Sequence, residues 1–276
     1  MSIENLAKGI VKGENGIYQS KSKSIISYPE EGNSDFMQIE ENSFWFRHRN
    51  NLIAECVQKY SPKDLFFDIG GGNGFVSKRL QEEGVDVVLV EPGESGAINA
   101  KSRGVENVLC STLEDALFSE NSIGSVGLFD VVEHIEDDLS FMQNIHSFMK
   151  SGSHVYITVP AYNFCWSNED DDAGHYRRYT VGDMKELLLK SGFEITFATY
   201  IFSILPFPVY IFRTIPSKLG LNKNSNDLEK HQNEHKDKTG FVNNMLQKIW
   251  DWELSRIKNE KSISMGGSCF VIAKKK

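Results

Sequence analysis

Short apolar runs alternate with amphipathic stretches in the middle of the chain. Five apolar runs predict strands, at 65–68, 85–90, 105–110, 123–129 and 154–159. Stretches between them repeat apolar residues every three or four positions, as helices do, at 75–83, 95–102 and 138–150. Strands and helices that alternate in this way predict a doubly wound α/β fold with a mostly parallel sheet.

Two more strands follow this central region. Thr180 and Asp183 have the spacing of a capping box, which predicts a helix that runs to about Lys190 and ends before Gly192. Residues 193–200 and 268–273 are further β-rich runs. The whole pattern predicts a Rossmann-like, seven-stranded, mostly parallel sheet with helices on both faces.

The N-terminal region shows a different pattern. Residues 1–40 are polar with weak periodicity and predict an arm or an irregular cover, whereas 43–60 predict a helix that is interrupted near Asn50 and Asn51. We therefore expect residues 1–60 to form an N-terminal arm and a lid helix beside the core.

A second unusual region precedes the last strand. Residues 201–212 are apolar, but Pro206 and Pro208 are expected to interrupt a helix there. Residues 222–238 are charged and predict a surface loop, and 241–257 have helical spacing. We expect 201–262 to be an insertion that forms a lid or substrate pocket, and 61–200 with 263–276 to form the core.

Composition narrows the class of protein. The 276 residues carry a net charge of −8, so a broad basic surface for nucleic acid is not expected. Four cysteines lie far apart without a CxxC pair, and the first residues lack the pattern of a signal peptide. These features predict reduced thiols and a cytoplasmic protein, either monomer or homodimer.

The apolar stretch 201–212 is too short to span a bilayer. It is expected to line a substrate pocket or a dimer contact. Peripheral contact with a membrane that carries lipid-linked substrates is the alternative hypothesis.

The first strand ends in an acidic residue and a glycine-rich turn. Asp68 is followed by Gly70, Gly72 and Gly74, a spacing that favours a tight strand–helix turn open to a ligand. A dinucleotide fingerprint would need glycine where Phe75 stands, and the Lys-Ser/Thr of a P-loop is absent. Glu91 ends the second strand, where a carboxylate can bind the hydroxyls of a ribose.

Seven stretches carry a resemblance to a known family: 68–74, 90–92, 113–115, 129–135, 41–49, 174–180 and 266–272. They resemble class I S-adenosylmethionine-dependent methyltransferases of the bacterial small-molecule type. The resemblance implies S-adenosylmethionine as cofactor, S-adenosylhomocysteine as product, and methyl transfer to a small-molecule or lipid-like acceptor. It implies these cofactor-binding residues: Asp68, Gly70, Gly71, Gly72, Gly74, Glu91, Pro92, Thr112, Leu113, Phe129 and Asp130. Thr112 departs from the family, which often has an acidic residue there.

Residues for the acceptor side are less specific. His134 and His175 are candidate general bases, because histidine titrates in the useful range, with capping or packing as the competing interpretation. Candidate acceptor contacts are Trp45, Arg49, Tyr176, Arg177, Arg178 and Tyr179. Trp45 and Arg49 fit plain helix packing equally well, and the arginines fit ion pairs with the acidic run 169–172. No metal is expected, because the residues of that run are adjacent rather than spaced as ligands.

Two alternatives to a methyltransferase remain open from the sequence. One is a non-catalytic protein that keeps the cofactor-binding fold. The other is an NAD-dependent oxidoreductase, which uses the same acidic residue at the end of its second strand.

Overall fold

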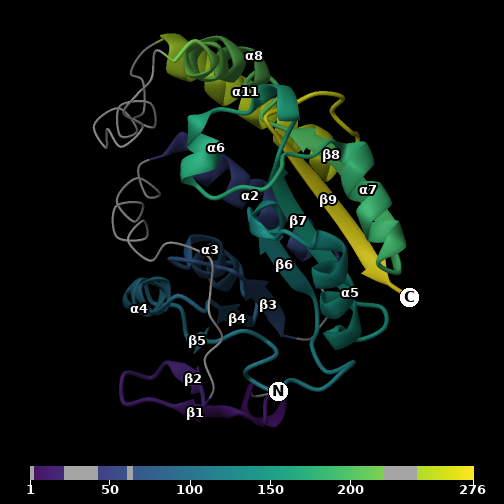
Figure 1. The fold of residues 1–276 in the computed structure, drawn as a ribbon. Coiled ribbons are helices and arrows are strands. Elements are labelled where there is room, and N and C mark those ends of the chain that lie inside the picture. The colour runs from purple at the N-terminus through teal and green to yellow at the C-terminus, as the bar shows by residue number, and fades with distance from the viewer. Residues whose placement is uncertain (1–2, 22–42, 61–64, 221–240) are drawn as a thin grey trace.

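A single mixed sheet forms the centre of the computed structural model, which describes residues 3–21, 43–60, 65–220 and 241–276. Within these ranges the sheet has nine strands in the order β1-β2-β5-β4-β3-β6-β7-β9-β8 (Figure 1). The strands are β1 (Ile10–Lys12), β2 (Tyr18–Ser20), β3 (Phe66–Ile69), β4 (Val87–Val90), β5 (Asn107–Cys110), β6 (Val126–Phe129), β7 (His154–Pro160), β8 (Phe193–Ile201) and β9 (Ser268–Lys275).

The centre of the sheet is parallel and its strand order reverses at β3. Strands β4 and β5 follow on one side of β3, while β6 and β7 follow on the other. Strand β9 pairs antiparallel with β7 and with β8. Ligands of open α/β sheets bind where the order reverses, so the carboxyl ends of β3 and β6 mark the expected site.

The predicted architecture is confirmed, but the predicted number of seven strands is wrong. Residues 3–21 form a short 3-10 turn and the hairpin β1–β2, and β2 pairs parallel with β5 through Tyr18 and Leu109. Three-residue strands contain too few alternations to stand out from an irregular segment. The expected irregular cover is therefore, over the described part of it, an extension of the sheet.

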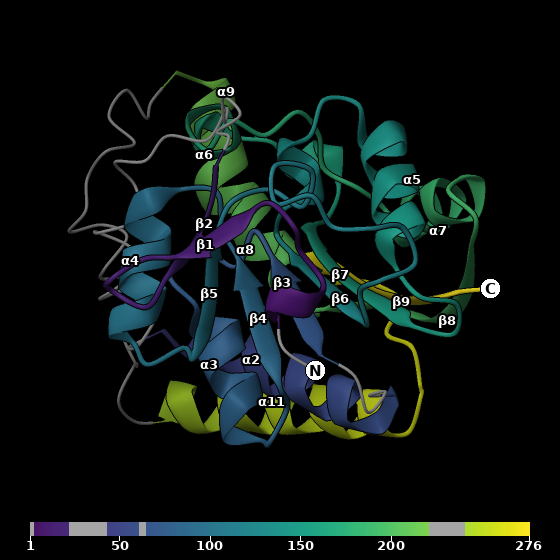
Figure 2. The same ribbon diagram turned by 90° about the horizontal axis from the view of Figure 1, so that it is seen from below.

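Helices cover both faces of the sheet (Figures 1 and 2). In Figure 2, α2, α3 and α11 lie across one face, and α5 and α7 lie on the other. The longer helices are α2 (Phe44–Tyr60), α3 (Phe75–Glu82), α4 (Glu94–Ser102), α5 (Asp138–Phe148), α7 (Val181–Lys190) and α11 (Phe241–Lys258). The expected capping box is present at α7, where the Asp183 amide donates to Thr180 Oγ1 at 3.1 Å.

Two helix predictions are wrong in their detail. Helix α2 runs unbroken through Asn50 and Asn51, because buried side chains hold it on both sides of that point, His48 before it and Leu52 after it. The prolines of the 201–212 stretch do not interrupt a helix. Pro206 and Pro208 lie in the first turn of α8 (Pro206–Val209), where amides have no helical partner to lose.

Helix α8 continues through a π-helical turn, Tyr210–Thr214, into α9 (Ile215–Lys218). The predicted helix at 241–257 is present as α11. The predicted surface loop at 222–238 lies outside the described residues.

Two further features bear on the sequence-based expectations. Over the described ranges, we find no helix with both the length and the apolar character that crossing a membrane requires. All four cysteines are buried, and none of them forms a disulfide bond.

Candidate functional site

The turn after β3 is shaped by three glycines with positive φ. Gly70, Gly72 and Gly74 have φ of +69°, +50° and +75°. A Cβ on Gly70 would lie 2.7 Å from a Val131 methyl carbon, and one on Gly74 would lie 2.8 Å from the Cβ of Ala100. A Cβ on Gly72 would meet no described atom within 4 Å. Gly70 and Gly74 therefore satisfy internal packing, whereas Gly72 presents bare backbone at an open face.

Asp68 lies buried beneath this turn. Its Oδ2 accepts a hydrogen bond from Ser77 Oγ at 2.6 Å. Burial raises the pKa of the Asp68 carboxyl to about 6, although the Ser77 hydrogen bond and the charge of Arg49 oppose the shift. The positive charge of Arg49 therefore only partly offsets the burial of Asp68. A cation that binds nearby would stabilise the ionised form of this carboxyl group further.

Glu91 joins the turn after β3 to the turn after β4. One carboxylate oxygen accepts the Gly72 amide at 2.9 Å and the other accepts the Gly93 amide at 2.7 Å. Burial raises the pKa of Glu91, and these two amides oppose the rise. Pro92 lies between Glu91 and Gly93 in the sequence. By binding both amides, the Glu91 carboxylate fixes the distance between the turn after β3 and the turn after β4.

The end of β5 holds the two residues predicted near the adenine. Thr112 Oγ1 accepts the Asp115 amide at 3.1 Å, and Leu113 is buried in the core. The Thr112 hydroxyl therefore caps a local turn, as Thr often does outside helices.

The end of β6 is held by a side chain from α2. Phe129 is buried, and Asp130 follows it with φ of +59°, a strained conformation for a residue with a side chain. Asp130 accepts a hydrogen bond from Thr158 Oγ1 at 3.0 Å and forms an ion pair with Arg49. Arg49 thus lies at the same edge as the glycine turn and contacts Asp130.

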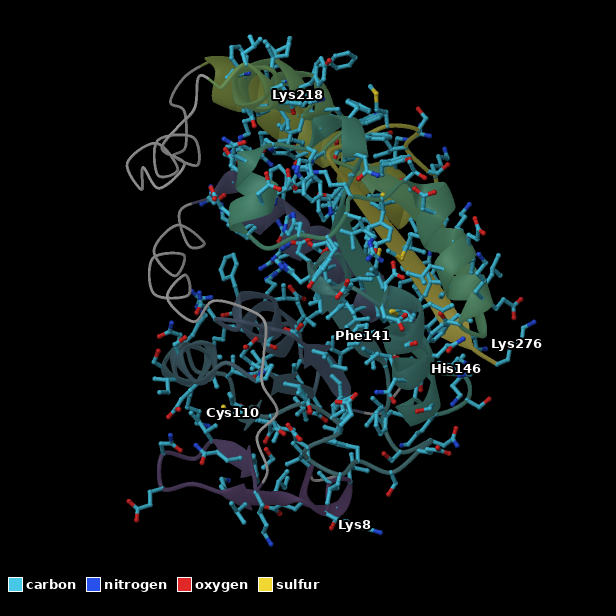
Figure 3. All side chains as sticks on the ribbon, viewed as in Figure 1. Lys8, Cys110, Phe141, His146, Lys218 and Lys276 are labelled. Carbon is cyan, nitrogen blue, oxygen red and sulfur yellow. The ribbon has the colours of Figure 1, made fainter. Side chains whose placement is uncertain are left out.

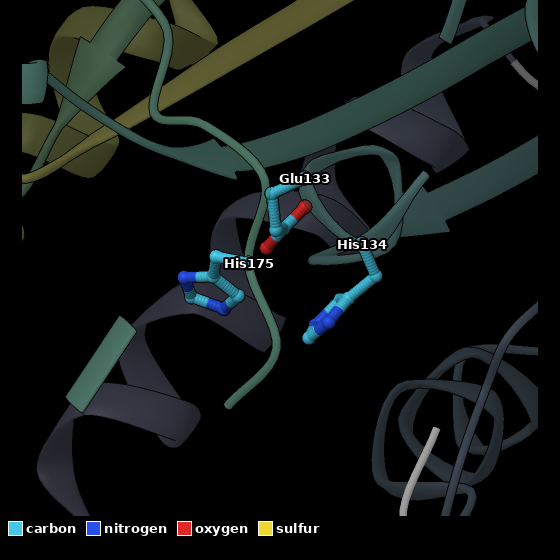
Figure 4. A group of neighbouring side chains, drawn as sticks. All are labelled: Glu133, His134 and His175. Atoms are coloured by element: carbon cyan, nitrogen blue, oxygen red, sulfur yellow. The ribbon is translucent and has the colours of Figure 1, made fainter. Parts of the chain in front are cut away.

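Three titratable side chains meet beyond β6, as Figure 4 shows. Glu133 is buried, and among the described residues its Oε2 has no hydrogen-bond partner. Burial raises the pKa of Glu133 well above its ordinary value, and the charge of Asp130 adds to the rise. The rings of His134 and His175 are 4.7 Å apart, and burial together with His175 lowers the pKa of His134 to about 4.

His175 is oriented by a buried carboxylate. Its Nδ1 lies 2.8 Å from Asp170 Oδ1, and Asp170 also accepts from Arg178 Nε at 2.7 Å and Nη2 at 3.0 Å. Burial would raise the pKa of Asp170, but its bonds to His175 and Arg178 lower it to about 2. Each of the three guanidinium nitrogens of Arg178 donates a hydrogen bond, two of them to Asp170 and one to the carbonyl oxygen of Ala161.

The neighbouring predicted contacts differ in exposure. Arg177 forms an ion pair with Asp138 at 2.6 Å, and the Tyr179 hydroxyl donates to the same carboxylate at 2.7 Å. Tyr179 is buried, whereas the side chain of Tyr176 is exposed. Acceptor contact by these residues stays a prediction, and Tyr176 is the one of them with an exposed ring.

Helix α2 is tied to the 201–262 region by a buried pair. His48 Nε2 lies 3.0 Å from Glu253 of α11, and Glu253 also accepts the amides of Phe202 at 2.9 Å and Ser203 at 2.6 Å. Trp45 stacks on Phe202 with ring centroids 3.9 Å apart. The predicted lid helix and the predicted insertion are therefore joined through one carboxylate.

Sequence reasoning placed Asp68, Glu91 and Asp130 at one edge of the sheet, as the structure does. It did not single out three further acidic residues, although it named Asp170 within the acidic run 169–172. Glu133, Asp170 and Glu253 are buried and organise their surroundings. An acid that directly follows two valines, as Glu133 does, is the one signal that was available.

The sequence and the fold match a known family. A family model described as a methyltransferase domain matches residues 45–197, more than half of the chain. The chain belongs to this methyltransferase family, and the predicted class, a class I S-adenosylmethionine-dependent methyltransferase, is confirmed. The NAD-dependent oxidoreductase gains no support from these matches.

Relatives extend the comparison. The chain is 19% identical over 160 residues to a protein of Mycolicibacterium smegmatis named "Probable S-adenosylmethionine-dependent methyltransferase", covering 57% of this chain and 62% of that one. It is 25% identical over 117 residues to a ubiquinone biosynthesis O-methyltransferase of Vibrio parahaemolyticus, covering 40% and 49%. The matches therefore span about half to three-fifths of these relatives.

A solved structure shows the same fold. The SAM-dependent methyltransferase of Thermotoga maritima aligns with a TM-score of 0.57 and 16% identity. The alignment covers 90% of this chain and 97% of that one.

Proposed function

We propose that this protein binds S-adenosylmethionine at the carboxyl ends of β3, β4 and β6 and transfers its methyl group to a small-molecule or lipid-like acceptor. The observation that carries the proposal is the open face of Gly72 beside the Glu91 carboxylate. Bare backbone next to a carboxylate suits a ligand that carries both a ribose and an amino acid part.

The residues present fit this cofactor. Asp68, Glu91 and Asp130 are three carboxyl groups at one edge of the sheet, and they favour a cationic ligand over a diphosphate. Gly70 to Gly74 would hold the amino acid part through their backbone, with Asp68 beneath them. Thr112 and Leu113 would lie near the adenine, and Pro92 and Phe129 would line the space between.

The bound cofactor supplies a methyl group on a positively charged sulfur, and the protein supplies alignment. Arg49 fixes Asp130 at the end of β6 and so keeps that edge in place. Trp45, stacked on Phe202, would help to exclude water from the acceptor side.

A proton on the acceptor nucleophile can be removed by His134 or His175. Asp170 orients the His175 ring through its contact with Nδ1, as a carboxylate does for a general base. His134 is neutral at pH 7, because its pKa is lowered to about 4, and it is therefore a weaker base than an ordinary histidine.

A lipid-like acceptor is favoured by one surface. The helical stretch from α8 through the π-helical turn to the end of α9 exposes a set of apolar side chains: Phe207, Ile211, Phe212, Ile215 and Leu219. Lys218, labelled in Figure 3, marks the end of this region. An exposed apolar patch is typical of contact with an apolar partner or a membrane surface, and the relative named for ubiquinone biosynthesis points the same way.

Calorimetric titration tests the cofactor. We expect S-adenosylhomocysteine to bind and NAD to give no heat above dilution. Glu91→Gln should weaken S-adenosylhomocysteine binding about tenfold or more, because it removes one acceptor for two backbone amides. The exposed Glu82→Gln is the matched control. Binding of NAD alone would overturn the proposal.

Methyl transfer is tested with an acceptor panel. We expect radioactive methyl from the labelled cofactor to appear in one class among phenols, amines and lipid-linked hydroxyl compounds. Cofactor binding without transfer to any class would favour the non-catalytic alternative. Sedimentation with phospholipid vesicles, comparing wild type with Phe212→Ser, tests the peripheral membrane contact.

A further inference from the structure

We propose that Glu133, His134 and His175 form a binding site for one divalent transition-metal ion. In the part of the chain that the structure describes, these residues are the one group of at least three acidic, histidine or cysteine side chains placed to share an ion. Their ligand atoms lie within 4.8 Å of one another. Figure 4 shows the carboxylate and both rings turned toward a common space.

The spacing is close to what coordination requires. Donor atoms bound to a tetrahedral ion at about 2.1 Å lie roughly 3.4 Å apart. Small side-chain rotations therefore suffice to bring the three donors onto one ion. Glu133 and His134 are adjacent on one short turn after β6, and His175 comes from the segment before α7.

Glu133 gives a second, independent indication of a ligand. Its side chain is about 1% exposed, and its Oε2 has no hydrogen-bond partner among the described residues. A buried carboxylate oxygen without a partner carries the full cost of its lost hydration. An ion at this position removes that cost.

The groups behind the ligands also fit a metal site. Metal-binding histidines usually donate their second ring nitrogen to a carboxylate or a carbonyl group. His175 has this arrangement through Asp170, at 2.8 Å from Nδ1. The backbone of Ala173 and Gly174 hydrogen-bonds to the ring of His134.

The donor set indicates the kind of ion. Two imidazoles and one carboxylate suit Zn²⁺, Mn²⁺ or Fe²⁺ better than Mg²⁺ or Ca²⁺, which prefer oxygen ligands. Three protein ligands leave at least one position for water or for an oxygen of another molecule. No change of oxidation state is involved.

His134 and His175 are also the candidate general bases, and a single ring nitrogen cannot serve in both roles at once. A histidine nitrogen bound to the ion cannot accept the acceptor's proton. The metal site does not depend on the proposed methyl transfer, and binding of the ion can be measured without cofactor.

Equilibrium dialysis against Zn²⁺ and, separately, Mn²⁺ tests the site, with the metal content measured by mass spectrometry. The protein is first treated with a chelator. We expect one ion per chain for wild type. His175→Ala and Glu133→Gln should each weaken binding about 100-fold, and Asp170→Asn about tenfold, because it acts through His175.

His146→Ala is the matched control, since His146 lies at the end of α5 away from the group. It should bind the ion like wild type. Circular dichroism checks that each variant is folded, and His134→Gln replaces any variant that is not. Co²⁺ bound by wild type should give the visible absorption of a mixed nitrogen and oxygen ligand field.

Wild-type protein without bound ion, or folded variants that bind as tightly as wild type, would overturn the proposal. Calorimetry with S-adenosylhomocysteine on the same samples keeps the two questions apart. Loss of the metal result with intact S-adenosylhomocysteine binding would remove the metal site and leave the proposed function standing.

Discussion

The site has two parts that are built in different ways. The glycine side consists of the turn 70–74 with Asp68 and Glu91, and the histidine side consists of Asp130, His134 and His175 with the carboxylates and arginines that contact them. On the glycine side, hydrogen bonds join residues close in sequence, such as Ser77 with Asp68 and Gly72 with Glu91, which are nine and 19 positions apart. On the histidine side, ion pairs form both between neighbours and between distant segments, since Asp170 and Arg178 are eight positions apart and Arg49 and Asp130 are 81. The first side depends on backbone shape, and the second depends on buried charge.

This difference predicts how each side fails. A wrong residue in the turn should affect ligand binding while the fold persists. A lost partner on the histidine side should leave a buried charge and destabilise the fold itself.

The largest effect is expected for Asp170→Ala. The variant leaves the Arg178 guanidinium buried without its carboxylate, which should lower the free energy of unfolding by about 3–4 kcal/mol. Urea denaturation measures the loss. Asp171→Ala, at the exposed neighbour, should change stability by only about 0.5 kcal/mol. Equal effects of the two variants would contradict the role given to Asp170.

Asp68→Asn should change how stability depends on pH. The pKa of Asp68 is raised from 3.8 to about 6, so the folded state holds the proton more tightly than the unfolded chain. Wild type should therefore lose on the order of 3 kcal/mol from this group as pH rises from 4 to 8. The variant lacks this loss, so its stability relative to wild type should increase over the same range. A constant difference measured by denaturation at pH 4 and 8 would refute the shift.

Gly72→Val tests the backbone side. The side chain would fill the open face of the turn, and we expect about 100-fold weaker binding of S-adenosylhomocysteine by calorimetry. Gly84→Val is matched, because Gly84 has φ of +80° and an equally open face away from the site. It should bind normally and lose only about 1–2 kcal/mol of stability. Unchanged affinity of Gly72→Val would refute this placement of the cofactor.

The smallest effect is expected for Arg177→Gln. Its ion pair with Asp138 is partly exposed, so thermal unfolding should show a loss of about 1 kcal/mol or less. A loss of stability as large as that of Asp170→Ala would contradict the idea that the partly exposed ion pair of Arg177 contributes less than the buried ion pair of Arg178.

The glycine side could be predicted from the sequence because its causes are local. Positive φ at Gly70 and Gly74, the buried strand before them and the acid after β4 each leave a pattern within about 25 residues. The capping box of α7 was predictable for the same reason.

The histidine side could be predicted only in part. The acidic run that contains Asp170 was a named partner for Arg178, but the spacing did not single out one carboxylate. Asp138 as the partner of Arg177, and Glu253 as the partner of His48, depend on how distant helices pack. The hairpin β1–β2 was missed because its strands are too short to carry a pattern.

The Glu253 carboxylate has a mechanical consequence. Burial would raise its pKa, but hydrogen bonds from His48 and Ser203 hold the pKa below its ordinary value, so the group is an anion held by three segments. Any motion that separates α2 from α11 would leave this buried anion without His48. The two helices should therefore move together as one rigid unit. Any hinge should lie outside the contact between His48 and Glu253.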